Sequence, residues 1–158
     1  MSIKFIRIDD RLIHGQVVTG WIKIHNAHNV LIVDDSVAKD EFLQSVLRIA
    51  APSGVNLYIK STENLEETVK TFDGSEQNTL VLLKTPETAK KLFDAGVQLR
   101  ELNVGGMGAN RYRKQLYKNV SASEEEVAVL SDLEAGGVKV YFRTVPADHE
   151  ILLSSLKK

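Results

Sequence analysis

Short hydrophobic runs recur along the chain and alternate with stretches in which hydrophobic residues follow a helical spacing. The runs are rich in valine, isoleucine and leucine, and each is about five residues long. Such continuous runs are typical of parallel strands that are covered on both faces. They predict strands at residues 3–8, 30–33, 55–59, 79–83, 102–104 and 138–142.

Helical spacing is found in the intervening stretches. Helices are predicted at residues 15–25 and 40–50, from residue 62, from 86 to 96, from 123 and from about 148. The hydrophobic positions of the helix at 40–50 are Phe42, Val46, Leu47 and Ile49. Thr85 followed by Pro86 is a start signal, because the threonine can cap the first turn and proline is tolerated there. Ser123 followed by three glutamates is another, because the acids face the positive end of the helix.

This alternation predicts an α/β fold, with an open, mostly parallel twisted sheet and helices on both faces. Residues 105–120 break the rhythm, and we expect an excursion or an extra edge strand there. The chain shows no repeat and no linker, so residues 1–158 are expected to form a single domain.

Composition narrows the class of protein. Hydrophobic residues make up 43% of the chain, there is no cysteine, and the formal net charge is -1. Disulfides and thiolate–zinc sites are therefore excluded, and a general nucleic-acid binder is disfavoured because it would show a basic excess. No hydrophobic stretch approaches the roughly 20 residues that cross a bilayer. We expect a soluble, cytoplasmic protein.

The segment after the first predicted strand has an unusual content, Asp9-Asp10-Arg11-Leu12-Ile13-His14-Gly15-Gln16. In open α/β sheets, ligands bind beyond the carboxyl ends of the strands. His14 is expected at the helix start, where exposed backbone N–H groups favour an anion. Gly15 leaves the imidazole uncrowded, and Arg11 offers donors that suit phosphate oxygens.

A neutral imidazole, with an ordinary pKa near ~6.5, can act as a nucleophile. Asp9 or Asp10, or a backbone carbonyl, could hold one ring nitrogen of His14 protonated and leave the other to attack. Which nitrogen attacks is left open by the sequence. The alternative is structural: a solvated loop histidine, two acids that cap the helix, and Arg11 in a surface ion pair.

Residues 103–108 place three glycines after a strand end. Gly105 and Gly106 could form an anion-binding nest that borders the His14 pocket, or a tight turn that needs positive φ. The basic cluster that follows, Arg111, Arg113, Lys114 and Lys118, is either a solvated face or a docking rim for an acidic partner.

Asp34 and Asp35 end the second predicted strand and suggest a rival, the receiver domain, which is phosphorylated on aspartate. That domain needs an aspartate after the third strand and a lysine after the fifth. Here those strands end in Lys60-Ser61 and in glycines, so helix capping or lining of the same cleft is favoured for the two acids. His25 and His28 have a metal-chelating spacing but no third ligand nearby, and no metal site is predicted.

The nine-residue run D-D-R-L-I-H-G-Q-V, near the N-terminus and after a short strand, resembles the active-site signature of the mannose/fructose/sorbose-type IIB components of the sugar phosphotransferase system (PTS). The segments Val30–Asp35 and Asn103–Met107 also fit that family, as does the order of elements. The resemblance covers essentially the whole chain. It adds a specific chemistry to the fold predicted above.

The resemblance implies a phosphocarrier that works as a protein-N(pi)-phosphohistidine–sugar phosphotransferase. The phosphorylated histidine falls on His14 and the active-site arginine on Arg11. Phosphate-binding or loop-shaping positions fall on Asp10, Gly15, Gln16, Gly105 and Gly106.

The implied partners are a separate IIA component as phosphoryl donor, the IIC and IID membrane components, and a sugar. The protein would associate peripherally with the membrane through them, without a cofactor. The identity of the sugar and any homo-oligomer stay open. The alternative function is a non-catalytic anion- or nucleotide-binding α/β module, or a receiver-like domain.

Overall fold

The computed structural model describes residues 1–156, with the side chains of Gln16 and Val17 outside the description. The strands are β1 (Ile3–Asp9), β2 (Asn29–Val33), β3 (Asn56–Lys60), β4 (Thr79–Leu83), β5 (Glu101–Gly106), β6 (Lys114–Tyr117), β7 (Val120–Ala122), β8 (Lys139–Phe142) and β9 (Ile151–Leu152). The helices are α1 (Gly15–Ile24), α2 (Asp35–Ala38), α3 (Glu41–Ala50), α4 (Leu65–Asp73), α5 (Pro86–Asp94), α6 (Glu124–Ala135) and α7 (Leu153–Leu156).

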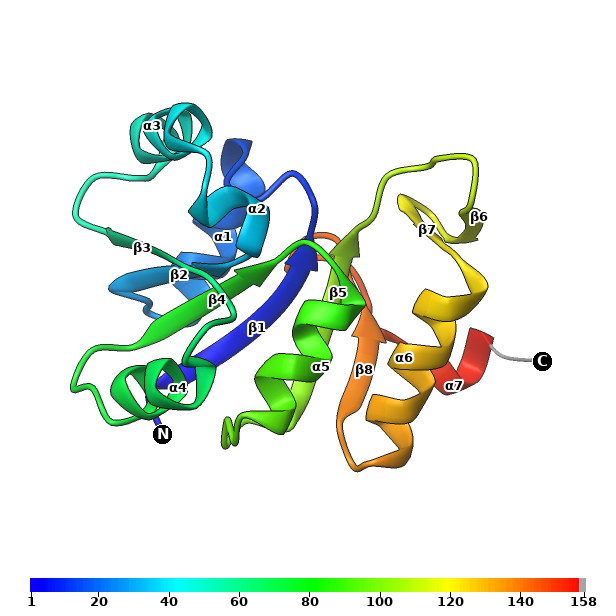
Figure 1. Ribbon diagram of the computed structural model, residues 1–158. Coiled ribbons are helices and arrows are strands. Elements are labelled where there is room, and N and C mark those ends of the chain that lie inside the picture. The colour runs from blue at the N-terminus through cyan, green and yellow to red at the C-terminus, as the bar shows by residue number, and fades with distance from the viewer. Residues whose placement is uncertain (157–158) are drawn as a thin grey trace.

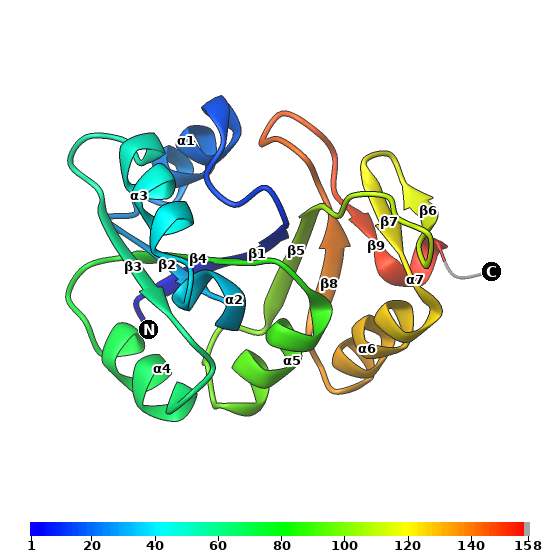
Figure 2. The ribbon, with the colours of Figure 1, turned by 45° about the horizontal axis from the view of Figure 1, so that its top comes forward.

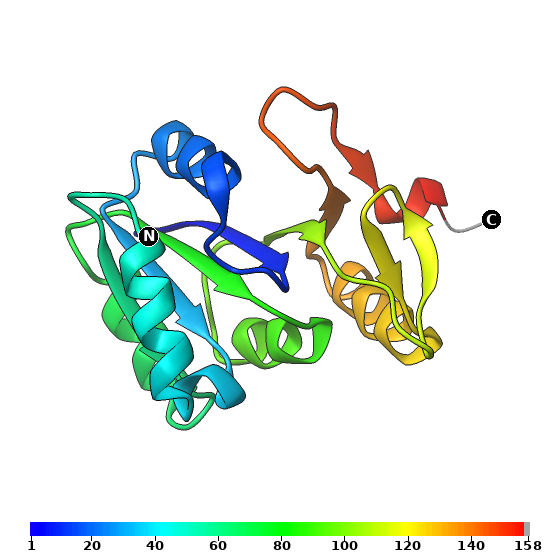
Figure 3. The ribbon, with the colours of Figure 1, turned by 90° about the horizontal axis from the view of Figure 1, so that it is seen from above.

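The sheet has seven strands in the order β3-β2-β4-β1-β5-β8-β9, and only β9 pairs antiparallel with its neighbour (Figure 1). Hydrophobic residues of α1, α2 and α3 join one core cluster, whereas those of α4, α5 and α6 join another. Seen from above, α1 lies on one side of the sheet, and α5 and α6 lie on the other (Figure 3). The predicted open α/β sheet with helices on both faces is confirmed.

The helix starts predicted at Thr85 and Ser123 are confirmed, whereas the helix predicted from residue 62 begins at Leu65. The side chain of Thr85 accepts a hydrogen bond from the Thr88 N–H at the start of α5, with Pro86 in the first turn. Ser123 and Glu126 form a reciprocal capping box on α6. Asp34 caps α2 by accepting from the Val37 N–H, so the capping role that we favoured for this acid is correct.

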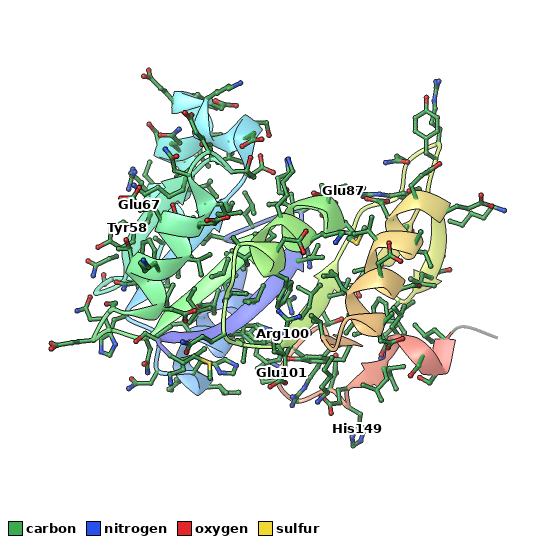
Figure 4. The ribbon with its side chains drawn as sticks, turned by 60° about the horizontal axis from the view of Figure 1, so that its bottom comes forward. Tyr58, Glu67, Glu87, Arg100, Glu101 and His149 are labelled. Carbon is green, nitrogen blue, oxygen red and sulfur yellow. The ribbon has the colours of Figure 1, made fainter. Side chains whose placement is uncertain are left out.

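One helix has a hydrophobic side that the fold leaves exposed, and one predicted helix start is wrong. On α3, Leu47 is buried, but Phe42 is 80% exposed and Ile49 is 85% exposed. The helix touches the core mainly through Leu47, since no other element within residues 1–156 covers its outer side. A helix does not begin at Asp148: β9 pairs with β8 first, because covering a sheet edge outweighs the local helical spacing. His149 therefore lies outside a helix and projects into solvent (Figure 4).

Residues 105–120 make the predicted excursion. Gly105 and Gly106 extend β5, and the chain then forms the antiparallel hairpin β6–β7, which is a separate two-stranded sheet beside α6 (Figure 2). Neither glycine has a positive φ. The prediction of a tight turn or a nest at these two residues is therefore wrong, since both conformations need a left-handed residue.

The strand order places a switch point between β1 and β5. After β1 the chain continues to β2, on one side of the switch point, whereas after β5 it continues to β8, on the other side. Ligands of open α/β sheets bind in the crevice at such a point, beyond the carboxyl ends of the strands. Among the helices of residues 1–156, none combines the length and the hydrophobicity needed to pass through a bilayer.

Candidate active site

The loop that joins β1 to α1 is held down by its own hydrophobic residues. The Leu12 N–H donates to the Asp9 carbonyl at 2.9 Å, which closes a turn, and Leu12 has a φ of 59°. A left-handed conformation costs a non-glycine residue roughly 1–2 kcal/mol. Leu12 and Ile13 are both buried in the core cluster under α1. Their burial offsets this cost and fixes the polar residues on either side of them.

Asp9 is the centre of the site. Its carboxylate is fully buried and lies next to three basic side chains. It accepts hydrogen bonds from Arg7 Nη2 at 3.1 Å and from the Arg11 backbone N–H, Nε and Nη2 at 3.1, 3.1 and 3.2 Å. Its Oδ2 also lies 3.0 Å from His14 Nε2. One carboxylate therefore orients both functional side chains that the sequence predicted, Arg11 and His14.

Arg7 supports Asp9 from below and was missed in the sequence analysis. Its side chain is fully buried, and Nη1 donates to Asn103 Oδ1 at 2.6 Å and to the Arg143 carbonyl at 3.0 Å. The available signal was an arginine within a buried strand, two residues before an acid. Residues i and i+2 of a strand share a face, so Arg7 and Asp9 could have been expected to pair.

Opposing influences act on the two buried charges. Burial on its own raises the pKa of Asp9, but the hydrogen bonds from Arg11 and His14 and the charge of Arg7 outweigh it and lower the pKa below its usual value. Burial lowers the pKa of Arg7, and the neighbouring Asp9 opposes that effect. Asp9 is consequently a carboxylate at neutral pH, which makes it an acceptor that keeps a proton on the facing nitrogen of His14.

His14 occupies the N-cap position of α1 in an extended conformation, and its side chain is 22% exposed. Because Nε2 faces the Asp9 carboxylate, the Nδ1 atom is the ring nitrogen that keeps a lone pair. No side chain within the described residues caps the first turn of α1. Gly15 has a φ of +49°, and a Cβ built on it would meet nothing within 4 Å. The surroundings of His14 on that side are open.

Arg11 is a surface residue that contacts the same carboxylate, that of Asp9. Its Nε and Nη2 form a two-point contact with Asp9, and its side chain is 48% exposed. Its Nη1 group makes no hydrogen bond within the part of the chain that the structure describes. The guanidinium is therefore oriented by one edge and can offer its other edge to an anion.

Asp10 points away from His14, toward the excursion. Its Oδ2 accepts from the Gly108 N–H at 2.7 Å and lies 3.4 Å from Arg113 Nη1. Arg113 in turn makes a two-point ion pair with Glu126, at 2.8 Å for each contact. The acid that orients the imidazole is thus Asp9, and Asp10 ties the loop to the hairpin.

The two glycines that the sequence placed at the site have separate surroundings. A Cβ on Gly106 would approach Arg11 Nη2 and Asp9 Oδ1, both at 3.0 Å, so this glycine borders the site. A Cβ on Gly105 would overlap the Arg7 guanidinium, so that glycine makes room for a buried charge. The side chain of Gln16 lies outside what the structure describes, and the prediction for it stays untested.

A larger hollow lies elsewhere. A groove of about 1260 Å³ runs between α4 and α5, on the other face of the sheet from α1, and contains no residue of the β1–α1 loop. It includes no histidine and no arginine. Asp9, Arg11 and His14 therefore lie outside this groove, on a loop at the surface.

Comparisons with known proteins show the family of the chain. The family model described as PTS system sorbose subfamily IIB component matches residues 3–158. The sorbose-specific EIIB component of Klebsiella pneumoniae is 36% identical over 151 residues, which are 96% of this chain and 92% of that protein. The fructose-specific EIIB component of Bacillus subtilis is 34% identical over 148 residues, which are 94% and 91% of the two chains.

Two further likenesses extend the comparison. The crystal structure of the IIBSor domain of the sorbose permease of Klebsiella pneumoniae superimposes with a TM-score of 0.93 at 35% identity, covering 99% of this chain and 96% of that one. The mannose-specific EIIAB component of Escherichia coli is 31% identical over 156 residues, which are 99% of this chain and 48% of that protein.

Proposed function

The chain belongs to the sorbose subfamily of PTS IIB components, and we propose that it carries a phosphoryl group on His14 between a protein donor and a sugar. The donor is the phosphohistidine of a IIA component. Members of this family are sugar-specific parts of the phosphotransferase system, as the names of the relatives state. The observation that carries the proposal is the contact of His14 Nε2 with the buried carboxylate of Asp9.

In the first step, the lone pair of His14 Nδ1 attacks the phosphorus atom of the donor phosphohistidine. The N–P bond of the donor breaks as the new N–P bond forms, and the donor imidazole leaves with the electron pair. The ring of His14 gains positive charge, which the Asp9 carboxylate stabilises at a distance of 3.0 Å. The proton on Nε2 remains there, held by Asp9.

Phosphoryl transfer depends mainly on positioning and on charge stabilisation. The outer N–H groups of Arg11 and the uncapped backbone N–H groups of α1 supply donors for the phosphoryl oxygens. Gly15 leaves space for them. Arg11 is oriented by Asp9 before the phosphoryl arrives, so little reorganisation is needed at the moment of transfer.

In the second step, a sugar hydroxyl attacks the phosphorus atom, the N–P bond breaks, and His14 Nδ1 leaves with the electron pair. The proton of the hydroxyl passes to water. The sugar is presented by IIC and IID membrane components, with which the protein associates peripherally at the cytoplasmic side. The relatives are named for fructose, sorbose, mannose and N-acetylgalactosamine, so a hexose or an N-acetylated hexosamine is the substrate class that we propose. Specificity would then lie largely in the membrane partner.

The test is intact-mass spectrometry at neutral pH after incubation with phosphoenolpyruvate, enzyme I, HPr and a IIA protein. Wild type should gain the mass of one phosphoryl group, and His14→Ala should gain none. His149→Ala is the matched control, since His149 is exposed and makes no contact with the loop, and it should label like wild type. Label on the His14→Ala variant would place the chemistry on another residue, and no label on wild type would favour the anion-binding module.

A further inference from the structure

The hairpin beside the β1–α1 loop is firmly attached to the site. We call residues 108–119 the hairpin arm. Its base is fixed by the Asn119 side chain, which donates to the Gly105 carbonyl at 3.1 Å, and by backbone hydrogen bonds from Met107 to Asn119 and from Ser121 to Met107. Near the other end, the Gly108 N–H donates to Asp10. The arm therefore keeps a defined position relative to the catalytic loop, and Figures 1 and 3 show it projecting from the sheet.

The arm concentrates positive charge. Residues 105–123 contain four basic residues and no acidic residue. The whole chain has 20 basic and 21 acidic residues, so the remaining residues contain 16 basic and 21 acidic ones. The local charge is thus +4 and the charge elsewhere is -5. Arg113 is neutralised by Glu126. The side chains of Arg111, Lys114 and Lys118 are exposed and make no ion pair within residues 1–156.

The tip of the arm also exposes an aromatic ring. Tyr112 is 74% exposed, and the Arg111 guanidinium lies 5.8 Å from the centre of its ring. Tyrosine and arginine are enriched at the centres of protein–protein interfaces, where lysine is depleted. The tip is thus suited to contact a protein, and the flanking lysines are suited to its charged rim.

The base of the arm lies close to His14. A standard interface covers about 800 Å² on each partner, which corresponds to a patch of roughly 16 Å radius. Asp9 touches His14, and the next residue, Asp10, is bonded to Gly108. Arg111 follows Gly108 by three residues, a span of at most about 11 Å. The base of the arm at Gly108 therefore lies within reach of a donor protein centred on His14, and Arg111 lies at most about 11 Å further along.

We propose that the hairpin arm is a docking surface for the phosphoryl-donor protein, and that this donor presents acidic side chains around its phosphohistidine. This inference rests on the proposed function and names the surface that its first step uses. The arm binds the donor and takes no part in the chemistry. Its three free charges raise the rate of encounter and lower the apparent KM for the donor.

The test uses the full-length chain with three neutralising changes, Arg111→Gln, Lys114→Gln and Lys118→Gln. The matched control carries Lys4→Gln, Lys70→Gln and Lys91→Gln, which remove the same charge from exposed positions outside the arm. The protein donor is the IIA part of the Escherichia coli mannose-specific EIIAB component, phosphorylated by phosphoenolpyruvate, enzyme I and HPr. The second donor is phosphoramidate, a small molecule that needs no docking surface.

We expect the arm variant to show a roughly 10-fold higher apparent KM for the protein donor at low salt, with kcat within about twofold of wild type. The difference should shrink to about twofold at high salt, because screening weakens exposed charges. With phosphoramidate, the arm variant should label within about twofold of the wild-type rate. The control variant should match wild type in all three measurements.

Other outcomes would overturn the proposal. An unchanged KM for the protein donor would remove the docking role, and vesicles of phosphatidylglycerol that bind wild type but not the arm variant would then assign the arm to a membrane. A loss of rate with phosphoramidate would place the arm in the chemistry. Wild type that accepts phosphoryl from phosphoramidate but not from the protein donor would refute docking alone. Wild type that accepts it from neither donor would refute the proposed function as well.

Discussion

Replacing Gly105 by alanine tests whether the buried charges under the loop hold the site together. A Cβ at this position overlaps the guanidinium carbon and both terminal nitrogens of Arg7. The guanidinium is held in place, because its two terminal nitrogens are bonded to Asp9, Asn103 and the Arg143 carbonyl. The methyl group must therefore displace a charge that is fully buried.

The size of the effect follows from two costs. Overpacking a filled core costs about 1–3 kcal/mol. Separating one partner of a buried ion pair costs about 3–5 kcal/mol, because the charge that remains is not compensated. The two costs overlap, so we expect Gly105→Ala to lower the free energy of unfolding by about 3–5 kcal/mol. In a domain of this size that corresponds to a fall in Tm of roughly 6–20 °C.

The assay is urea unfolding followed by circular dichroism, with differential scanning calorimetry for Tm. Gly20→Ala is the matched control, since a Cβ on this glycine inside α1 would make only ordinary contacts with Pro146, at 3.6 and 3.7 Å. It should stabilise the protein by about 0.5–1 kcal/mol, as alanine does in a helix. A loss below about 1 kcal/mol for Gly105→Ala would refute the view that Arg7 is immobile.

Two titrations give further predictions. Asp9→Asn should slow phosphorylation of His14 and destabilise the fold by about 3–5 kcal/mol at neutral pH. Because the folded pKa of Asp9 is lowered, the higher stability of wild type should persist above about pH 4 and fade as the pH drops through that lowered value. Urea unfolding at a series of pH values that shows no such loss would contradict this prediction. Burial, with the charges of Glu101 and Glu150, raises the pKa of Tyr141 to about 12. Tyrosine in the unfolded chain ionises near pH 10, so wild type should lose stability between about pH 10 and 12. Tyr141→Phe should lose less stability over this range. Equal stability of the two proteins at every alkaline pH would contradict a role for Tyr141.

The parallel sheet and most helix starts could be predicted because both depend on local signals. Buried strands appear as continuous hydrophobic runs, and a cap such as Ser123 acts on its own first turn. The C-terminal segment could not be predicted in this way, since the pairing of β9 with β8 depends on which edge of the sheet is free. The exposure of the hydrophobic outer side of α3 could not be predicted either, because it depends on which elements pack against that side.

At the site, the sequence identified residue types but not their partners. His14 and Arg11 stand in one short segment with two acids, and nothing in their spacing distinguishes Asp9 from Asp10. The choice is made by Arg7 and by Gly108, which contact one acid each. The contact of Arg7 with Asp9 lies within β1, but the contact of Asp10 with Gly108 and that of Arg7 with Asn103, 96 residues further on, depend on how the strands align. Such a pairing has no signature in a local window of sequence.

The contacts of Arg7 also set the order in which the protein acquires its activity during synthesis. His14 is made before Asn103 and Arg143, yet Asp9 is held by an arginine that needs the Asn103 side chain and the carbonyl of Arg143. At about 5–20 residues per second, the 129 residues from His14 to Arg143 take roughly 6–26 s to translate. Until then His14 lacks this support, so on the proposed function we expect a nascent or truncated chain to accept phosphoryl groups more slowly than the folded protein.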